Sequence, residues 1–265
     1  DVCVDAGSQV LSGGLPTGGT YFGTGITSGN FDPSTAGVGT HSIGYAYSDV
    51  NGCSDTAYQN ITVNPLPTAS FTATNMCFGD TLRPVNTSTG ASSYSWDFDD
   101  GNSSTAASPE HRYTNSGTYT VSMIAETNKG CSDTTDATVS VATQPLADFT
   151  VADDCVHDAL TFTNATSVAC GTVSNYEWSY GDGNVDNVSS LTNPTHQYAK
   201  PGTYTARLVI TLANNTTDTA YRTLTVHAQP EAGFVNTAAC EGNLMQFTDT
   251  TVAQSSTTLS SYSWT

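Results

Sequence analysis

The sequence predicts an all-β protein built of tandem immunoglobulin-like sandwiches, strung like beads on a string. Three observations predict it. One block occurs twice, as YSWDFDDG at Tyr94–Gly101 and as YEWSYGDG at Tyr176–Gly183. Each copy is followed by a second shared stretch with identical internal spacing, PEHRYTNSGTYT from Pro109 and PTHQYAKPGTYT from Pro194. Apolar residues alternate with period 2 between turn residues, which is typical of strands. A fixed repeat divides a long polypeptide into small units that each bury their own core.

Two aromatic residues in each repeated sandwich are expected to build its core and one of its ends. Trp96 and Trp178 occupy the same place in the repeat and are interpreted as core anchors of a central strand. Tyr119 and Tyr204 each follow a Gly-Thr pair, an arrangement that resembles the tyrosine corner of immunoglobulin-like sandwiches.

Three similar proline-containing linkers, near residues 63–71, 141–149 and 226–234, mark the boundaries between units. We therefore predict a glycine-rich domain at 1–64, repeated domains at 65–143 and 144–228, and the first part of a further domain at 229–265, where the block restarts at Tyr262-Ser-Trp264. Proline fixes φ, so the joints are expected to be semi-rigid. Both ends are expected to be cut from a longer array.

The composition is strongly acidic, with 6 Lys and Arg against 24 Asp and Glu and a net charge of −18. Nucleic acid needs cationic contacts, so a nucleic-acid partner is not expected. No apolar run approaches the roughly 18 to 20 residues that span a bilayer, so no membrane span is expected in this segment. A polar surface rich in Ser, Thr, Asn and Gly is typical of extracellular β proteins.

Seven cysteines occur without the C-x-x-C spacing of zinc or redox sites. A Gly-Cys-Ser-Asp sequence follows the first cysteine of each of the first two domains, and in the third domain an extra cysteine substitutes for it. We predict one bridge inside each of three domains: Cys3–Cys53, Cys77–Cys131 and Cys155–Cys170. Cys240 is expected to find its partner beyond Thr265. Such bonds persist only in oxidising surroundings, which favours an extracellular location.

These motifs resemble the signature of the polycystic kidney disease (PKD) domain, whose usual form is WDFGDG, then PxHxY, then GxYxVxL. Residues 65–143 match nearly throughout, with Asp99 replacing the usual glycine. Residues 144–228 match well, with Ser179-Tyr180 in place of Asp-Phe, and 229–265 match as far as they extend. The resemblance implies tandem PKD-like sandwiches.

Residues 1–64 are similar to a glycine-rich immunoglobulin-like repeat of very large surface and secreted proteins of Bacteroidetes bacteria. The resemblance rests on GGTYFGTG from Gly18, Phe31-Asp-Pro33, Ala36-Gly-Val-Gly39 and Asn51-Gly-Cys-Ser-Asp55. It implies export by the type IX secretion system and a role as a surface adhesin, including gliding-motility adhesins.

The acidic turn with Asp97, Asp99 and Asp100 is a candidate calcium site, because Ca²⁺ takes carboxylate and carbonyl oxygens. The alternative is that such aspartates hold turn backbone through hydrogen bonds. His111 and His196 share one repeat position and are expected to be packed, hydrogen-bonded structural residues. No catalytic fingerprint occurs, so no enzyme activity and no cofactor other than structural calcium are expected.

Asp-Thr followed by an apolar residue resembles the O-glycosylation signal of Bacteroidetes. It makes Thr56, Thr81 and Thr219 candidate glycan sites, the alternative being threonine-rich strands beside turns.

Two functions remain open. The first is a non-catalytic structural and adhesive segment of a bacterial cell-surface protein, a stalk or filament whose partners are neighbouring repeats, other copies in a filament, and surface glycans or polysaccharide. The second is a set of spacer modules in a secreted enzyme that degrades polysaccharide or protein, with exposed aromatics such as Tyr21 and Phe22 touching the substrate. A catalytic domain in the neighbouring sequence would favour the second.

Overall fold

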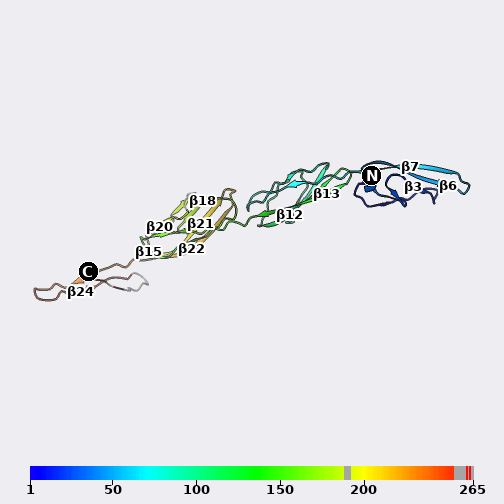
Figure 1. The fold of residues 1–265 in the computed structure, drawn as a ribbon. Helices are drawn as coiled ribbons and strands as arrows, with labels where there is room; N and C mark the ends of the chain where they lie inside the picture. The colour runs from blue at the N-terminus through cyan, green and yellow to red at the C-terminus, as the bar shows by residue number, and fades with distance from the viewer. Residues whose placement is uncertain (188–191, 254–260, 262, 264–265) are drawn as a thin grey trace. The chain divides into compact units, whose positions relative to one another are not determined.

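The computed structural model describes residues 1–187, 192–253, 261 and 263 and is almost entirely β (Figure 1). About 48% of the chain lies in strands and 2% in helix, in tandem β-sandwiches, so the predicted fold class is confirmed. The chain divides into two compact units, one with residues 1–76 and 80–142 and one with 77–79 and 143–265. In the part of the chain that is described, no helix is long and apolar enough to cross a membrane. Tyr262 and Trp264 of the restarted block lie outside the described residues.

The first sandwich of unit 1 is formed by two small sheets. One sheet has the order β1-β7-β6-β3 (Val2–Cys3, Ser54–Asn64, Gly39–Ser48, Thr20–Phe22). The other has the order β2-β5-β4 (Gln9–Val10, Asn30–Phe31, Ile26–Thr27), and the short helix α1 (Pro33–Ala36) follows β5. Phe31, Ile43 and Val63 from both sheets are buried against each other and form its core. Asp32 caps α1 by accepting hydrogen bonds from the amides of Ser34 and Thr35.

The second sandwich of unit 1 contains the first copy of the repeated block. Its main sheet has the order β11-β10-β12-β13 (Ser103–Ser104, Ser93–Asp97, Gly117–Glu126, Ser132–Val141), and β8 (Phe71–Thr72) pairs with β9 (Val85–Asn86). Trp96 on β10 is buried and meets the Phe71 ring edge to face, with centroids 5.0 Å apart. Val121, Met123 and Ala125 of β12 are fully buried in alternation with more exposed neighbours, as the period of 2 predicts.

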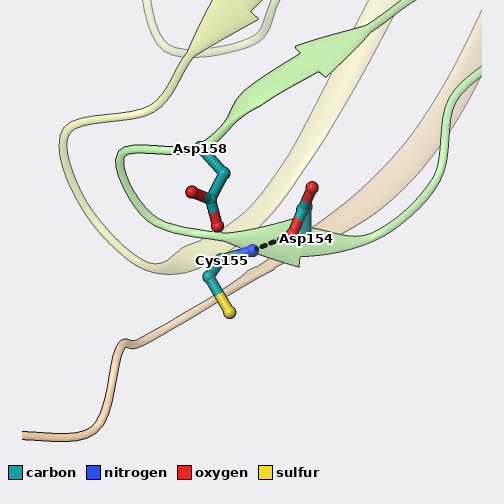
Figure 2. A group of neighbouring side chains, drawn as sticks. All are labelled: Asp154, Cys155 and Asp158. Atoms are coloured by element: carbon teal, nitrogen blue, oxygen red, sulfur yellow. Dashed lines mark hydrogen bonds between the residues drawn. The ribbon is translucent and has the colours of Figure 1, made fainter.

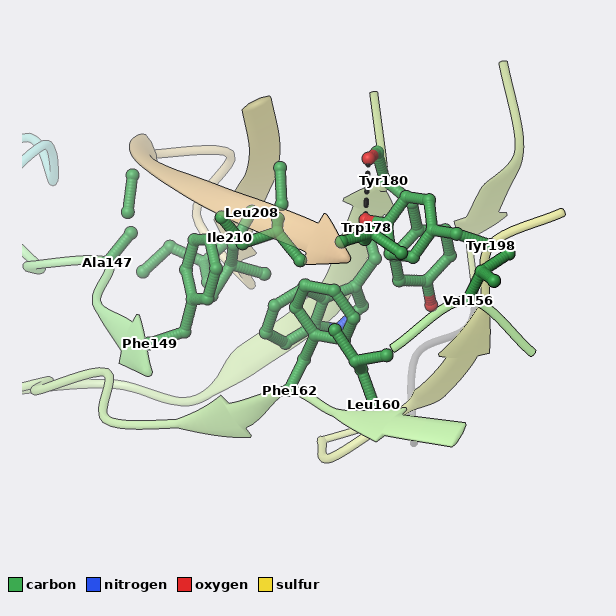
Figure 3. Packing of buried hydrophobic residues seen from close by; sticks show 14 residues of the cluster. Ala147, Phe149, Val156, Leu160, Phe162, Trp178, Tyr180, Tyr198, Leu208 and Ile210 are labelled. Carbon is green, nitrogen blue, oxygen red and sulfur yellow. Dashed lines mark hydrogen bonds between the residues drawn. The ribbon is translucent and has the colours of Figure 1, made fainter. Parts of the chain in front are cut away.

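The sandwich of unit 2 repeats this arrangement. Its main sheet has the order β15-β22-β21-β18-β19 (Asp154–Cys155, Thr217–His227, Gly202–Leu212, Val173–Ser179, Val185–Asn187). Two short pairs complete it, β14 with β17 (Phe149–Thr150, Thr163–Asn164) and β16 with β20 (Ala159–Thr161, Thr195–Gln197). Figure 3 shows its core, in which Trp178, Phe149 and Phe162 lie together. Trp178 meets Phe149 at 5.2 Å in the geometry of the first copy.

A further pair of strands, β23 (Phe234–Asn236) and β24 (Phe247–Asp249), follows in unit 2. Its register joins Phe234 to Asp249, just as Phe149 pairs with Asn164 at the opening of the preceding sandwich. The bridge between Glu231 and Val252 likewise corresponds to the one between Leu146 and Ser167. Residues 231–252 therefore repeat the opening elements of a sandwich.

In the first and third sandwiches a short early strand runs parallel to the last strand of that sandwich. Cys3 on β1 lies opposite Asn64, and Cys155 on β15 lies opposite His227. In the second sandwich, Met76, which precedes Cys77, pairs in parallel with Val141. The first cysteine of each sandwich therefore lies beside the C-terminal end of a long strand, a placement that decides the disulfide pattern.

Candidate functional site

The acidic turn of the repeated block is held together by an Asp–His pair. Asp100 Oδ2 lies 2.8 Å from His111 Nε2, and both side chains are largely buried. The imidazole stacks on Phe98 at a centroid distance of 4.2 Å and meets Tyr113 edge on. The Tyr113 hydroxyl donates to the Phe98 carbonyl at 3.0 Å. The WDFDDG and PxHxY stretches thus fold onto each other at one end of the sandwich.

The second copy of the block builds the same cluster. Asp182 Oδ2 lies 2.7 Å from His196 Nε2, and the imidazole stacks on Tyr180 at 4.1 Å. Tyr198 donates its hydroxyl to the Tyr180 carbonyl at 2.8 Å, a bond visible in Figure 3. Both histidines are packed and hydrogen-bonded, as expected from the sequence.

The electrostatics of these turns favour the ionised carboxylates. Burial raises the pKa of Asp100, but hydrogen bonds from the Asn102 amide and from His111 outweigh that effect, so the pKa lies below its ordinary value. The pKa of Asp182 is lowered in the same way, by Asn184 and His196 against the effect of burial. Burial also raises the pKa of the Tyr113 hydroxyl, which stays neutral.

The three carboxylates of the calcium hypothesis are each engaged by hydrogen-bond donors of the chain. Asp97 Oδ1 accepts from the Asp99 amide at 2.9 Å, and Asp99 Oδ2 accepts from the Thr120 amide at 2.9 Å. Asp100 Oδ1 accepts from the Asn102 amide at 3.1 Å, while its other oxygen meets His111. The aspartates therefore organise turn backbone, which is the alternative considered from the sequence.

Asp99 and Gly181 occupy the same position in the two copies of the repeated block. Both have left-handed backbone, with φ of 62° and 81°. A Cβ at Gly181 would lie 2.6 Å from the Thr205 carbonyl oxygen, so glycine is required there. Aspartate tolerates the left-handed region better than most residues, and its bond to Thr120 stabilises this turn.

One cluster with potential metal ligands lies elsewhere, at Asp154, Cys155 and Asp158 (Figure 2). It is the only group of three such side chains in the described part of the chain whose ligand atoms lie within 4.8 Å of one another. Two carboxylates supply at most four oxygens, whereas Ca²⁺ takes six to eight. Asp154 Oδ1 already accepts from the Cys155 amide at 2.8 Å.

An open, polar groove of about 560 Å³ lies beside His196. Tyr180 and Asp186 line it, and the Tyr180 hydroxyl donates to Asp186 Oδ2 at 2.6 Å. His196 is the lining residue whose side chain best suits acid–base chemistry, and it is already hydrogen-bonded to Asp182. The described lining residues of the groove offer hydrogen-bonding groups.

The predicted disulfide pairing is wrong. The structure bonds Cys3 to Cys131 and Cys77 to Cys170, with Cα atoms 5.6 and 5.3 Å apart. The unpaired thiols are those of Cys53, Cys155 and Cys240. Cys3 and Cys131 lie in unit 1, and Cys77 and Cys170 lie in unit 2. Each bond thus joins one predicted domain of the sequence to the next.

Strand direction explains the error. Cys3 lies beside the last residue of β7, whereas Cys53 immediately precedes its first residue. The 11 residues of β7 separate those ends by about 33 Å, far more than the roughly 4.4–6.8 Å between bonded cysteines. Cys77 and Cys131 flank the ends of β13 in the same way. Cys155 lies opposite His227, and Cys170 precedes β18 near the turn at the other end of β22.

The predicted core and corner residues lie as follows. Trp96 and Trp178 are almost completely buried, and Trp96 Nε1 donates to the Ala106 carbonyl at 2.9 Å. The Tyr119 hydroxyl donates to the carbonyl of residue 115 at 3.0 Å, and the Tyr204 hydroxyl to that of residue 200 at 2.8 Å. Both tyrosines thus bond backbone four residues upstream, as in a tyrosine corner.

The three candidate glycan sites differ in exposure. Thr56 on β7 and Thr219 on β22 are exposed, whereas Thr81 is half-buried. Asp218, which precedes Thr219, makes a structural hydrogen bond, because its Oδ2 accepts from the Ala147 amide at 2.7 Å. Asp133 accepts in the same manner from Ala69 at 2.8 Å. No role was expected for these two aspartates from the sequence; the signal that could have found them is the shared Asp-Thr after each hairpin turn.

The fold and the repeated clusters define this chain as a series of immunoglobulin-like sandwich modules. The PKD domain family model matches residues 62–141 and 142–226, more than half of the sequence, and the chain belongs to that family. PKD domains are generally non-catalytic and typically extracellular, and the two disulfides fit an oxidising location.

Solved structures similar to parts of this chain include two PKD1 domains of Vibrio. That of Vibrio anguillarum Epp is 25% identical, with a TM-score of 0.30, over 33% of this chain and 98% of that one. That of the Vibrio cholerae metalloprotease PrtV is 26% identical, with a TM-score of 0.28, over 31% and 96%. Fibronectin(III)-like modules of Clostridium thermocellum CbhA are 16% identical, with a TM-score of 0.27, over 62% and 95%.

Proposed function

We propose that this chain is a non-catalytic structural and adhesive segment of a large bacterial cell-surface protein, in which linked sandwiches form a stalk or filament for adhesion or gliding. The observation that carries the proposal is the disulfide pattern. Cys3–Cys131 and Cys77–Cys170 each connect consecutive domains of the sequence instead of closing a single one. Bonds placed in this way reinforce the connections of an array, which are the points that carry load when it is pulled.

The acidic turns support a structural role. The Asp100–His111 and Asp182–His196 pairs are both packed against aromatic rings, and their carboxylates accept hydrogen bonds from turn backbone. An acid–base site has no use for two identical copies in consecutive modules. The same geometry in both copies is instead what a repeated sandwich end requires.

The finer assignment rests on the resemblance of residues 1–64 to Bacteroidetes surface repeats. In this proposal the protein is exported by the type IX system, contacts surface glycans or polysaccharide and adjoins further repeats, of which residues 229–265 open one. Thr56 and Thr219 offer exposed hydroxyls for O-glycosylation, and Thr81 offers a half-buried one.

Antibodies raised against the chain test this proposal on cells that carry its gene. We expect intact, unpermeabilised cells to be labelled, and deletion of the gene to reduce their attachment or gliding. As a control, the deletion strain is complemented with a variant that lacks residues 65–228, so that a loss of attachment or gliding can be assigned to these domains and not to other effects of the deletion. Labelling only of an enzyme released into the medium, with unchanged attachment, would contradict the proposal.

One observation favours the second function, a spacer module that touches an insoluble substrate. The Phe22 and Tyr58 rings are exposed on the β3-β6-β7 surface and meet edge to face at 6.1 Å. Phe22 lies across Gly44, where a Cβ would come within 2.3 Å of its ring. Tyr21, the other aromatic residue suggested from the sequence, is half-buried against Tyr45 at 4.8 Å instead.

Pull-down with insoluble polysaccharides tests this second function. We expect the double variant Phe22→Ala/Tyr58→Ala to lose retention if the aromatic pair binds sugar rings. Tyr221→Ala removes an aromatic residue of similar exposure from another sandwich and serves as the matched control. Equal retention of all three proteins, or none of any, counts against a substrate-contact role.

A further inference from the structure

Two positions in each sandwich recur with the same backbone geometry. We call the first the edge position, the cysteine beside the end of the last strand, occupied by Cys3, Cys77 and Cys155. In the first and third sandwiches the residue after it donates its amide to the last strand, Val4 to Asn64 at 3.0 Å and Val156 to His227 at 2.8 Å. In the second, Met76 makes the parallel bridge directly before Cys77.

The second is the turn position, the residue that closes the hairpin formed by the last two strands. It is Cys53 in the first sandwich, Cys131 in the second and Thr216 in the third. Its carbonyl accepts from the amides of Asp49, Thr127 and Leu212 at 2.9, 2.8 and 2.8 Å. The preceding residue is left-handed in every case, with φ of 85° at Gly52, 80° at Gly130 and 64° at Asn215.

Both disulfides join an edge position to the turn end of the next sandwich in sequence. Cys3 bonds directly to the turn position, Cys131. Cys77 bonds to Cys170, and the adjoining Phe78 carbonyl accepts from Thr216 Oγ1 at 3.3 Å and from Asn214 Nδ2 at 2.9 Å. In the third sandwich the cysteine has therefore moved to the loop beside the turn, while the turn still contacts the edge segment.

Among the free cysteines, Cys155 occupies an edge position and Cys53 a turn position. We propose that these thiols are the two unpaired halves of the same disulfide site. Each is completed by the complementary cysteine of another sandwich of this kind: Cys155 takes a turn cysteine, and Cys53 takes an edge cysteine. The independent support is that equivalent positions, Cys3, Cys77 and Cys131, are bonded within this chain.

The bond forms by oxidation of two thiols to one disulfide, with loss of two protons and two electrons. The oxidant is another disulfide, such as that of a thiol–disulfide oxidoreductase in an oxidising compartment, which is reduced to two thiols. The thiolate of one cysteine attacks it to form a mixed disulfide, and the second cysteine displaces the leaving thiolate.

The first experiment uses the full chain with Cys240→Ser, so that Cys53 and Cys155 are the remaining free thiols. The protein is incubated with reduced and oxidised glutathione at several concentrations and mapped by mass spectrometry without reduction. If copies pair at random, the yield of the 53–155 bond equals the summed yields of the 53–53 and 155–155 bonds. We expect the 53–155 bond to exceed that sum roughly tenfold, which corresponds to about 1.4 kcal/mol of specific docking between copies.

The second experiment supplies the partner in the same polypeptide. Residues 66–143 are appended a second time after residue 228, so that a sandwich with a turn cysteine follows the one that contains Cys155. We expect Cys155 to bond to the added copy of Cys131 at every protein concentration. A bond in this arm alone identifies an adjoining repeat as the natural partner, and a bond in the first arm shows that a second copy suffices. Random or absent pairing of Cys155 in both arms overturns the proposal.

A third measurement tests the site inside the chain as it stands. In the double variant Cys170→Ser/Thr216→Cys we expect the cysteine at position 216 to bond to Cys77, because it occupies the position that Cys131 has in the preceding sandwich. Cys170→Ser alone is the control, in which Cys77 becomes open to alkylation. If Cys77 is equally open in both variants, the two turn ends are not equivalent and the proposal fails.

Discussion

Replacing Cys77 with Ser will leave the fully stretched length of the oxidised chain unchanged, although it removes one of two disulfides. Under tension the path runs from the N-terminus to Cys3, across the bond to Cys131 and on to the C-terminus. That bond hides 128 residues from extension. The Cys77–Cys170 bond adds only a second, longer route between Cys131 and Cys170, so the shorter direct route still limits the stretch.

The lengths follow from about 3.5 Å per extended residue. Reduction of the wild type should therefore release about 450 Å, from the 128-residue separation of Cys3 and Cys131. In Cys3→Ser the remaining bond hides 93 residues, so the oxidised variant should stretch further than wild type by 128 − 93 = 35 residues, or about 120 Å.

Single-molecule force spectroscopy measures these lengths when the chain is held at both ends and Cys53, Cys155 and Cys240 are replaced by Ser. Bridges within single domains give a different result, because a Cys77–Cys131 bond hides 131 − 77 = 54 residues. Cys77→Ser would then lengthen the oxidised chain by about 190 Å. That increase would refute the crossed pairing.

Three further predictions concern the repeated clusters. Trp178→Ala should lower the free energy of unfolding by about 3–5 kcal/mol in urea titrations, because it empties the centre of a packed core. Gly181→Ala should cost more than about 1 kcal/mol, since its left-handed backbone and the nearby Thr205 carbonyl exclude a Cβ; a neutral effect contradicts the assigned turn. Asp182→Asn should destabilise the chain at pH 7, and the difference should fade below pH 3.8 as wild-type Asp182 is protonated, because its folded pKa lies below that unfolded value; a constant difference contradicts the role given to its charge.

Much of the fold is predictable because repeated residues report repeated packing. The block around Trp96 and its second copy around Trp178 implies one core arrangement used twice, and the alternation in β12 and β21 assigns their buried faces. The histidines are also predictable, because a role needed at the same place in consecutive modules is more readily structural than catalytic.

The disulfides could not be predicted by the same means. Sequence spacing places Cys3 near one end of its domain and Cys53 near the other, but it does not tell that the first short strand runs parallel to the last. Because of this strand direction, Cys3 lies beside the last residue of β7, whereas Cys53 lies just before its first residue. The place of Thr216 is predictable, because Asn214–Asp218 stands in the sequence where the other domains have Gly-Cys-Ser-Asp, and the hairpin hydrogen bonds agree with that alignment.

The crossed order of the bonded cysteines has a mechanical consequence that bridges within domains do not share. Cys77 lies between Cys3 and Cys131 in the sequence, and Cys131 lies between Cys77 and Cys170, so the two closed loops overlap in residues 77–131. If the Cys3–Cys131 bond is lost, the chain still contains a bond that bypasses most of the second domain. An array that continues the pattern through Cys53 and Cys155 would therefore have no domain boundary that depends on a single covalent path.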